Sequence, residues 1–129
     1  MNRTNTRIFI VEDSPPIRER LEKVISAAAG VEIVGNAESP SEAIAGILRT
    51  EPDCVVLDYQ LLGGTGIEVL RAVRPILPTT AFVVLSNHSS PQYRRVCVEA
   101  GAAAFLDKST EFEKVTEVIA TLVPSVNQA

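Results

Sequence analysis

Residues 54–61 read CVVLDYQL, and the interpretation of the whole chain starts from this stretch. Four apolar residues, Cys54 to Leu57, run without alternation into the carboxylate of Asp58. A run of this kind is typical of a central parallel strand that is covered on both faces. We therefore expect Asp58 at the carboxyl end of a buried strand, which is the edge where open α/β sheets bind their ligands.

Polar side chains also follow three other apolar runs. Ile8–Val11 is followed by Glu12 and Asp13, Ala81–Leu85 by Ser86, and Ala103–Asp107 by Lys108. The carboxyl ends of parallel strands meet at one edge of a sheet. If these strands are neighbours, three carboxylates, a hydroxyl and an ammonium group lie together on that edge.

Strand-like and helix-like segments alternate along the chain. Helical patterns follow each of the four runs and also an alternating, half-exposed run at residues 31–34. Five strand–helix pairs predict parallel strands joined by right-handed crossovers. We expect an α/β fold, a flavodoxin-like (βα)5 doubly wound parallel sheet with strand order 2-1-3-4-5.

Four local signals make predictions about helix ends and loops. Ser14, before two prolines, is expected to cap the first helix, and Ser39 with Glu42 the second. Thr110 with Glu113 predicts a capping box for the fifth helix. Glycines at 63, 64 and 66 indicate positive φ angles or close backbone approach after Asp58.

The totals exclude several classes of protein. At 129 residues the chain has the size of one domain. A net charge of −4 with scattered basic residues argues against direct nucleic-acid binding. Neither a membrane-spanning run nor a secretory signal is present, so a cytoplasmic protein without membrane contact is expected. Cys54 and Cys97 lack metal-binding spacing and are interpreted as reduced, buried residues.

The predicted cluster of carboxylates favours phosphoryl transfer. Three carboxylates within a few ångströms repel one another and near pH 7 must hold a proton or bind a cation. Mg²⁺ prefers oxygen ligands and commonly binds one or two carboxylates together with a phosphoryl oxygen. Asp58 can then act as a nucleophile that forms an acyl phosphate, while Lys108 and Ser86 contact the phosphoryl oxygens.

This arrangement resembles the receiver domain of bacterial two-component response regulators. The motifs that carry the resemblance are the acidic pair Glu12–Asp13, Asp58, Ser86, Phe105 and Lys108. The expected organisation is a single receiver domain over residues 1–129, with a core at about 7–123 and a frayed tail at 124–129.

The resemblance implies a role for each of these residues. Asp58 is the phosphoacceptor, and Asp13, Asp58 and the backbone carbonyl of Gln60 bind Mg²⁺ directly, with Glu12 acting through water. A sensor histidine kinase or a histidine phosphotransfer protein supplies the phosphoryl group. Phosphorylation draws Ser86 inward and turns Phe105 toward the core, which changes contacts with an unknown downstream protein. The resemblance also implies that the chain is not an enzyme, because it catalyses only the phosphorylation and dephosphorylation of its own aspartate.

Two departures from the family pattern lead to further expectations. Ser109 follows the lysine where the family usually has proline, and the cost of about 2.5–4 kcal/mol for a non-proline cis bond favours a trans peptide. Asn87 replaces a small residue after Ser86 and is expected to narrow access to the phosphoryl group. His88 is a second residue expected to modulate the site, through contact with the attacking water.

Several alternatives remain open or less favoured. The chain is a stand-alone regulator, a phosphorelay intermediate, or the receiver part of a longer helix-turn-helix transcription regulator. A phosphorylation-independent scaffold is disfavoured by the intact acidic pair, Asp58 and Lys108. A phosphatase usually has a second carboxylate two residues after its nucleophile, where this chain has Gln60. A flavin-binding protein is disfavoured because Glu12 and Asp13 would repel phosphate.

Overall fold

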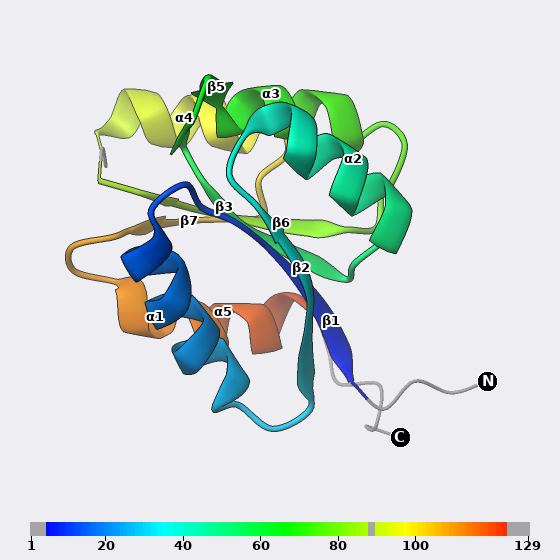
Figure 1. Cartoon of the computed structure of the whole chain (residues 1–129). Helices are drawn as coiled ribbons and strands as arrows, with labels where there is room; N and C mark the ends of the chain where they lie inside the picture. The colour runs from blue at the N-terminus through cyan, green and yellow to red at the C-terminus, as the bar shows by residue number, and fades with distance from the viewer. Residues whose placement is uncertain (1–4, 88–89, 124–129) are drawn as a thin grey trace.

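The protein is a three-layer α/β structure, seen here in a computed structural model that describes residues 5–87 and 90–123 (Figure 1). The main sheet has five parallel strands in the order β2-β1-β3-β6-β7. Its strands are β1 (Thr6–Val11), β2 (Val31–Ala37), β3 (Cys54–Asp58), β6 (Ala81–Ser86) and β7 (Ala104–Asp107). Counted within this sheet, the order is the predicted 2-1-3-4-5, and the flavodoxin-like fold is confirmed.

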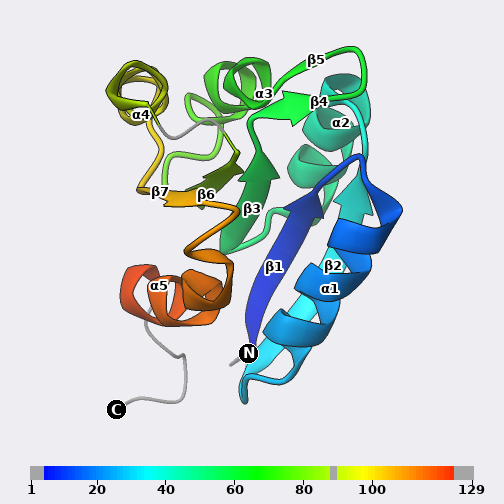
Figure 2. The same cartoon turned by 90° about the vertical axis from the view of Figure 1, so that its left-hand side faces the viewer.

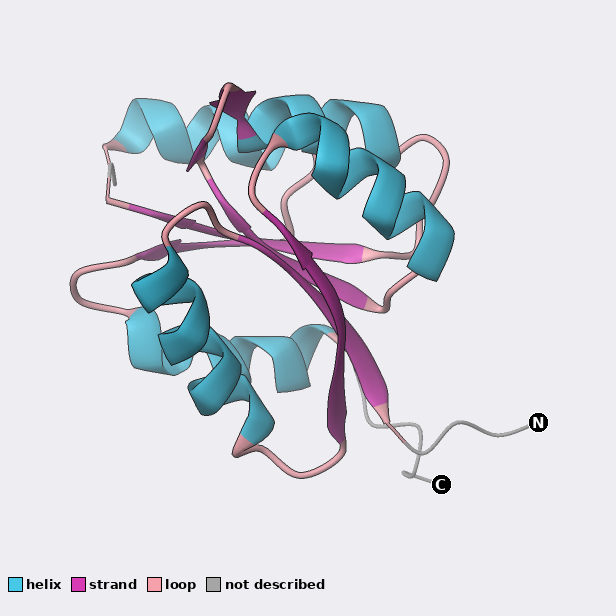
Figure 3. Cartoon of the chain, viewed as in Figure 1, coloured by secondary structure: helices cyan, strands magenta, loops and turns pink. Residues whose placement is uncertain are grey.

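Within the described residues, five α-helices are present. They cover the two faces of the sheet (Figures 2 and 3). They are α1 (Pro15–Ser26), α2 (Pro40–Thr50), α3 (Gly66–Val73), α4 (Pro91–Glu99) and α5 (Val115–Leu122). Helices α1 and α5 lie on one face, and α2, α3 and α4 lie on the other. This division follows from right-handed crossovers on either side of β1, where the direction of winding reverses.

Alternate strand residues supply two separate layers of core. Phe9, Val55 and Phe82 pack toward α2, α3 and α4, whereas Ile8, Cys54 and Val83 pack toward α1 and α5. Successive side chains of a strand point to opposite faces, so a central strand buried on both faces must be apolar at every position. The unbroken apolar runs in the sequence therefore identified the central strands correctly.

The segment after Asp58, where the glycines predict a loop, forms a small hairpin. Strands β4 (Gln60–Leu61) and β5 (Gly64–Thr65) pair antiparallel. Gly63 has φ 83° in the turn, as the glycine pattern predicts. A Cβ on Gly66 would lie 2.5 Å from the carbonyl oxygen of Asp58. The predicted close backbone approach is therefore confirmed at Gly66, the first residue of α3.

Helix starts were predicted with mixed success. Ser39 caps α2 by accepting a hydrogen bond from the Glu42 N–H at 3.3 Å, as expected. Ser14 occupies the N-cap position of α1, but its side chain makes no capping bond. The capping box at Thr110 is wrong, because a 3-10 turn, η1 (Phe112–Lys114), precedes α5. Asp107 Oδ1 instead accepts the Ser109 and Thr110 N–H groups and forms a side-chain-closed turn.

The backbone contains neither a cis peptide bond nor a membrane-spanning helix within the described residues. Within residues 5–87 and 90–123, every peptide bond is trans, including that between Lys108 and Ser109, as expected. In the same residues, none of the helices has the length and apolar character needed to cross a bilayer. The tail at 124–129 lies outside the described residues.

Candidate functional site

Strand pairing brings the predicted site residues to one edge of the sheet. Val11 pairs with Leu57, so Glu12 continues β1 beside Asp58, the last residue of β3. Ser86, the last residue of β6, pairs with Asp107, so Lys108 directly follows β7 at the same edge. Four neighbouring parallel strands therefore place these side chains together.

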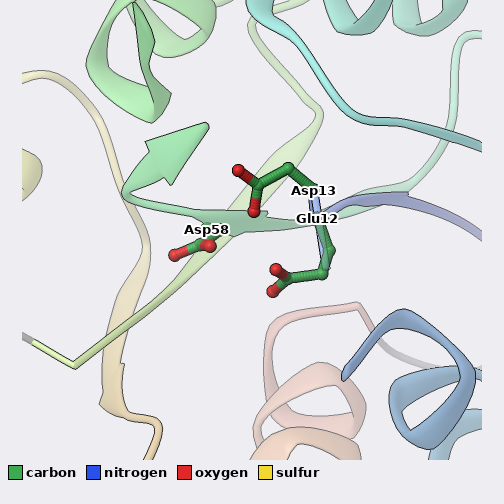
Figure 4. Close-up of side chains that lie close together, drawn as sticks. All are labelled: Glu12, Asp13 and Asp58. Carbon is green, nitrogen blue, oxygen red and sulfur yellow. The ribbon is translucent and has the colours of Figure 1, made fainter. Parts of the chain in front are cut away.

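Glu12, Asp13 and Asp58 form a compact acidic cluster, shown in Figure 4. One carboxylate oxygen from each residue lies within 4.8 Å of the others. Glu12 is 1% exposed and Asp58 8% exposed, while Asp13 is partly exposed. The cluster thus joins two buried carboxylates to a third at the solvent edge.

Lys108 supplies the positive charge within this cluster. Its Nζ lies 2.8 Å from Glu12 Oε1 and donates to Asp58 Oδ2 at 2.9 Å. The side chain of Lys108 is only 7% exposed. Buried charges in proteins need partners at close range, and one ammonium group here bridges two carboxylates. Glu12 Oε2 also accepts the Ser14 N–H at 3.1 Å, which orients its carboxylate.

Burial and charge shift the pKa values of these groups. Burial raises the pKa of Glu12 to about 7, against the opposing effect of Lys108. Burial likewise raises the pKa of Asp58, although Lys108 opposes the shift. For Lys108, burial lowers the pKa, but contacts with Glu12 and Asp58 outweigh it and the net shift is upward. Lys108 therefore stays protonated at neutral pH, whereas the upward shifts of Glu12 and Asp58 show that burial disfavours their charged forms.

The donor set of the cluster fits a hard divalent cation. Carboxylate oxygens within a few ångströms of one another are the ligands that Mg²⁺ prefers, and partial exposure of Asp13 leaves space for bound waters. One ammonium group against three carboxylates leaves negative charge that a cation would neutralise. The residues present therefore match the predicted kind of metal site.

The cluster lines a cleft of about 240 Å³ at the sheet edge. Seven predicted site residues line it: Glu12, Asp13, Asp58, Gln60, Ser86, Asn87 and Lys108. Ser86 is 1% exposed, whereas the side chains of Gln60 and Asn87 are exposed at the rim. His88 lies outside the described residues.

Among the predicted site residues that the structure describes, Phe105 does not line the cleft. Phe105 is 5% exposed and belongs to the core layer beneath α2, α3 and α4. The guanidinium carbon of Arg94 lies 4.9 Å from the ring centroid. The structure thus separates Phe105 from the acidic cluster and places it against α4.

Two residues that line the cleft, Ser14 and Ile17, are not among the predicted site residues. The sequence predicts Ser14 as a helix cap, yet in the structure its N–H donates to Glu12. Ile17 belongs to the apolar stripe of α1, and nothing in that pattern separates a residue that packs in the core from one at a cleft wall. The direct pairing of Lys108 with Glu12 was also missed, because ion-pair partners across 96 positions carry no local signal.

Comparison with known proteins identifies relatives of this chain. The family described as the response regulator receiver domain matches residues 8–120. The uncharacterized transcriptional regulatory protein YxjL of Bacillus subtilis (strain 168) is 30% identical over 119 residues, covering 92% of this chain and 55% of YxjL. Protein-glutamate methylesterase/protein-glutamine glutaminase 1 of Syntrophus aciditrophicus (strain SB) is 34% identical over 104 residues, covering 79% of this chain and 30% of that protein.

A solved structure gives the same result. The crystal structure of a LuxR-family two-component response regulator from Aurantimonas sp. SI85-9A1 matches with a TM-score of 0.84 and 31% sequence identity. The match covers 92% of this chain and 85% of that chain.

Fold and site together define a doubly wound α/β protein with a lysine-bridged acidic pocket at the carboxyl edge of its sheet. This chain belongs to the response regulator receiver domain family, as its motifs predicted. It is a receiver domain of two-component response regulators, and its class of function is signal transduction. The chain spans about half of the length of YxjL and about a third of the length of the methylesterase.

Proposed function

We propose that Asp58 is the phosphoacceptor of this receiver domain. The observation that carries the proposal is the contact of 2.9 Å between Lys108 Nζ and Asp58 Oδ2 inside the acidic cleft. A carboxylate at the end of a buried strand, with an ammonium group fixed beside it, is positioned for nucleophilic attack on phosphorus.

Phosphoryl transfer from a phosphohistidine to Asp58 forms one bond to phosphorus and breaks another, and it consumes no third reactant. A carboxylate oxygen of Asp58 forms a bond to phosphorus, the P–N bond of a donor phosphohistidine breaks, and the leaving imidazole nitrogen keeps the electron pair. The Lys108 ammonium faces the oxygens of the transferred group and stabilises their charge. The Ser86 hydroxyl, at the adjacent strand end, donates a hydrogen bond to another phosphoryl oxygen.

Mg²⁺ is the proposed cofactor of this site. Asp13, Asp58 and the main-chain carbonyl of Gln60 would hold it directly, and Glu12 would hold it through a water molecule. When bound, Mg²⁺ supplies neutralisation of the negative charge shared by the carboxylates and the phosphoryl oxygens. Glu12, which the structure pairs with Lys108, also holds the ammonium group within the cleft while Asp58 reacts.

The proposed output is a change of protein contacts. Phosphorylation draws Ser86 toward the phosphoryl group and fixes Phe105 in the core, so that the surface formed by α4, β7 and α5 changes. The proposed partners are a sensor histidine kinase or histidine phosphotransfer protein and a downstream effector. Two relatives are named as a transcriptional regulatory protein and as a methylesterase. These names support a downstream effector that is either a separate protein or a further domain of the same chain.

The test is intact-mass spectrometry after incubation with acetyl phosphate. We expect one phosphoryl adduct on the wild type with Mg²⁺, and none with EDTA or with Asp58→Asn, because both the nucleophile and the cation are required. Glu19→Gln, which alters an exposed carboxylate on α1, is the matched control and should retain the adduct. Absence of an adduct on a folded wild type in every condition would refute the proposal in favour of a scaffold that works unphosphorylated.

A further inference from the structure

Arg94 of α4 holds the buried ring of Phe105 from outside. Its guanidinium carbon lies 4.9 Å from the ring centroid, and its Nη1 donates to the main-chain carbonyl oxygen of Phe105 at 3.2 Å. Arg94 itself is exposed, whereas Phe105 is 5% exposed. The ring is therefore enclosed between the core layer and a charged side chain that faces solvent.

Both contacts restrict the same motion. A guanidinium group stacked on an aromatic face is attracted by the ring quadrupole, and this attraction must be lost before the ring swings outward. The bond to the carbonyl ties the end of Arg94 to the backbone of β7 at the same residue. Both contacts come from α4, so they act on Phe105 whatever the charge of Asp58.

Tyr93, the residue before Arg94, connects α4 to the segment that follows Asp58. Tyr93 packs edge-to-face on Tyr59, with ring centroids 5.0 Å apart. Tyr59 directly follows Asp58, and its N–H donates to Leu85 O at 3.1 Å. Adjacent residues of α4 thus contact the segment after Asp58 and the strand before Lys108, which makes α4 the element that links the two.

We infer that Arg94 is a positioning residue that keeps Phe105 in its buried position independently of Asp58. This inference rests on the proposed function, in which the buried ring belongs to the phosphorylated arrangement. Because coupling between two sites is reciprocal, a contact that favours the buried ring also favours phosphorylation of Asp58. Arg94 then sets the fraction of unphosphorylated molecules in which the Phe105 ring is already buried.

Fluorine NMR of protein labelled with 4-fluorophenylalanine tests this inference. The chain has four phenylalanines, so few resonances are expected, and Phe105→Leu assigns the one of interest. Without a phosphodonor, Arg94→Ala should shift or broaden that resonance as the ratio of buried to outward ring falls about two- to fivefold, the effect of one exposed cation–π contact. At limiting acetyl phosphate, the phosphorylated fraction of Arg94→Ala should also fall, by at most this factor.

Two variants separate positioning from a general effect of charge. Arg95→Ala removes an exposed arginine from the next position of α4 and should leave the Phe105 resonance unchanged. Arg94→Lys keeps the charge but loses the planar stacking, so its resonance should lie between those of the wild type and Arg94→Ala.

The outcomes distinguish this inference from the proposed function. A Phe105 resonance that is the same in Arg94→Ala and in the wild type without donor overturns the role of Arg94, whether or not Asp58 is phosphorylated. An equal change in Arg95→Ala overturns it as well. Failure of the proposed function appears separately, as the absence of a phosphoryl adduct by mass on wild-type protein.

Discussion

At the scale of single residues, Lys108 supplies the positive charge that partly neutralises the acidic pocket. Its ammonium group lies within 2.9 Å of oxygens from both Glu12 and Asp58. Removing one partner of a buried ion pair leaves the other charge uncompensated, which usually costs more than the pair contributed. Glu12 and Asp58 are therefore kept at close range by one cation, which also faces the proposed phosphoryl position.

Asn87 is the residue that we expect to control the lifetime of the phosphoryl group. It follows Ser86 and lies exposed at the rim of the cleft. Asn87→Ala should open the path of water to phosphorus and speed decay of the adduct at least about twofold, which is a small change in barrier of about 0.4 kcal/mol. The measurement is the decay of the adduct by intact mass after removal of the donor. Gln92→Ala, an exposed polar change on α4, is the control, and equal decay of Asn87→Ala and wild type would contradict the role of Asn87.

At the scale of elements, the β4–β5 hairpin and the start of α3 determine how the segment after Asp58 is held. The Gly66 N–H donates to Tyr59 O at 2.7 Å, which closes the hairpin segment next to the end of β3. Tyr59, between Asp58 and the hairpin, is in turn contacted by Tyr93 of α4. Tyr59, the residue directly after Asp58, is thus held by contacts with both the hairpin segment and α4.

Gly66→Ala should destabilise the fold, because the new Cβ would lie 2.5 Å from the Asp58 carbonyl oxygen and 3.0 Å from Leu57 Cγ. Backbone and core atoms must then shift, at a cost of about 1–3 kcal/mol in the free energy of unfolding. Urea denaturation followed by circular dichroism measures this cost.

Gly63→Asn is the matched control for the same hairpin. Gly63 has φ 83°, a Cβ at this position would meet no atom within 4 Å, and asparagine tolerates this backbone region. Its unfolding free energy should fall less than that of Gly66→Ala. The reverse order would show that backbone conformation, and not close approach to Asp58, dominates in this segment.

At the scale of the whole molecule, one sheet separates two core layers, and each contains one cysteine. Cys97 belongs to the layer under α2, α3 and α4, and Cys54 to the layer under α1 and α5. Burial raises the pKa of the Cys54 thiol to about 12 and that of Cys97 to about 11. Thiolates, which are the reactive form, are therefore rare in the folded protein at pH 8.

We expect iodoacetamide at pH 8 to leave both cysteines unlabelled in the native protein and to label both in urea. Because the two layers share one sheet, both should become reactive over the same urea range, as peptide mass spectrometry would show. Labelling of Cys97 well before Cys54 would indicate that the α4 layer opens separately.

The free energy of unfolding should fall as pH rises above about 9, since the thiols ionise there in the unfolded chain while those of the folded protein stay protonated.

The sequence alone determined the class of fold and most residues of the site. Unbroken apolar runs identified the central strands, because a strand buried on both faces has no polar position. The residue after each run then identified Glu12, Asp58, Ser86 and Lys108, because parallel strands end at a common edge. These features depend on local pattern and on topology rules, which a single sequence contains.

Only the tertiary structure decided which side chains contact one another. The pairing of Lys108 with Glu12, the position of Arg94 over Phe105 and the packing of Tyr93 on Tyr59 all join segments far apart in the chain. The start of α5 also escaped prediction, since Asp107 closes a turn that displaces the expected cap at Thr110. Such contacts depend on helix placement and side-chain direction after packing, and local propensity does not specify either.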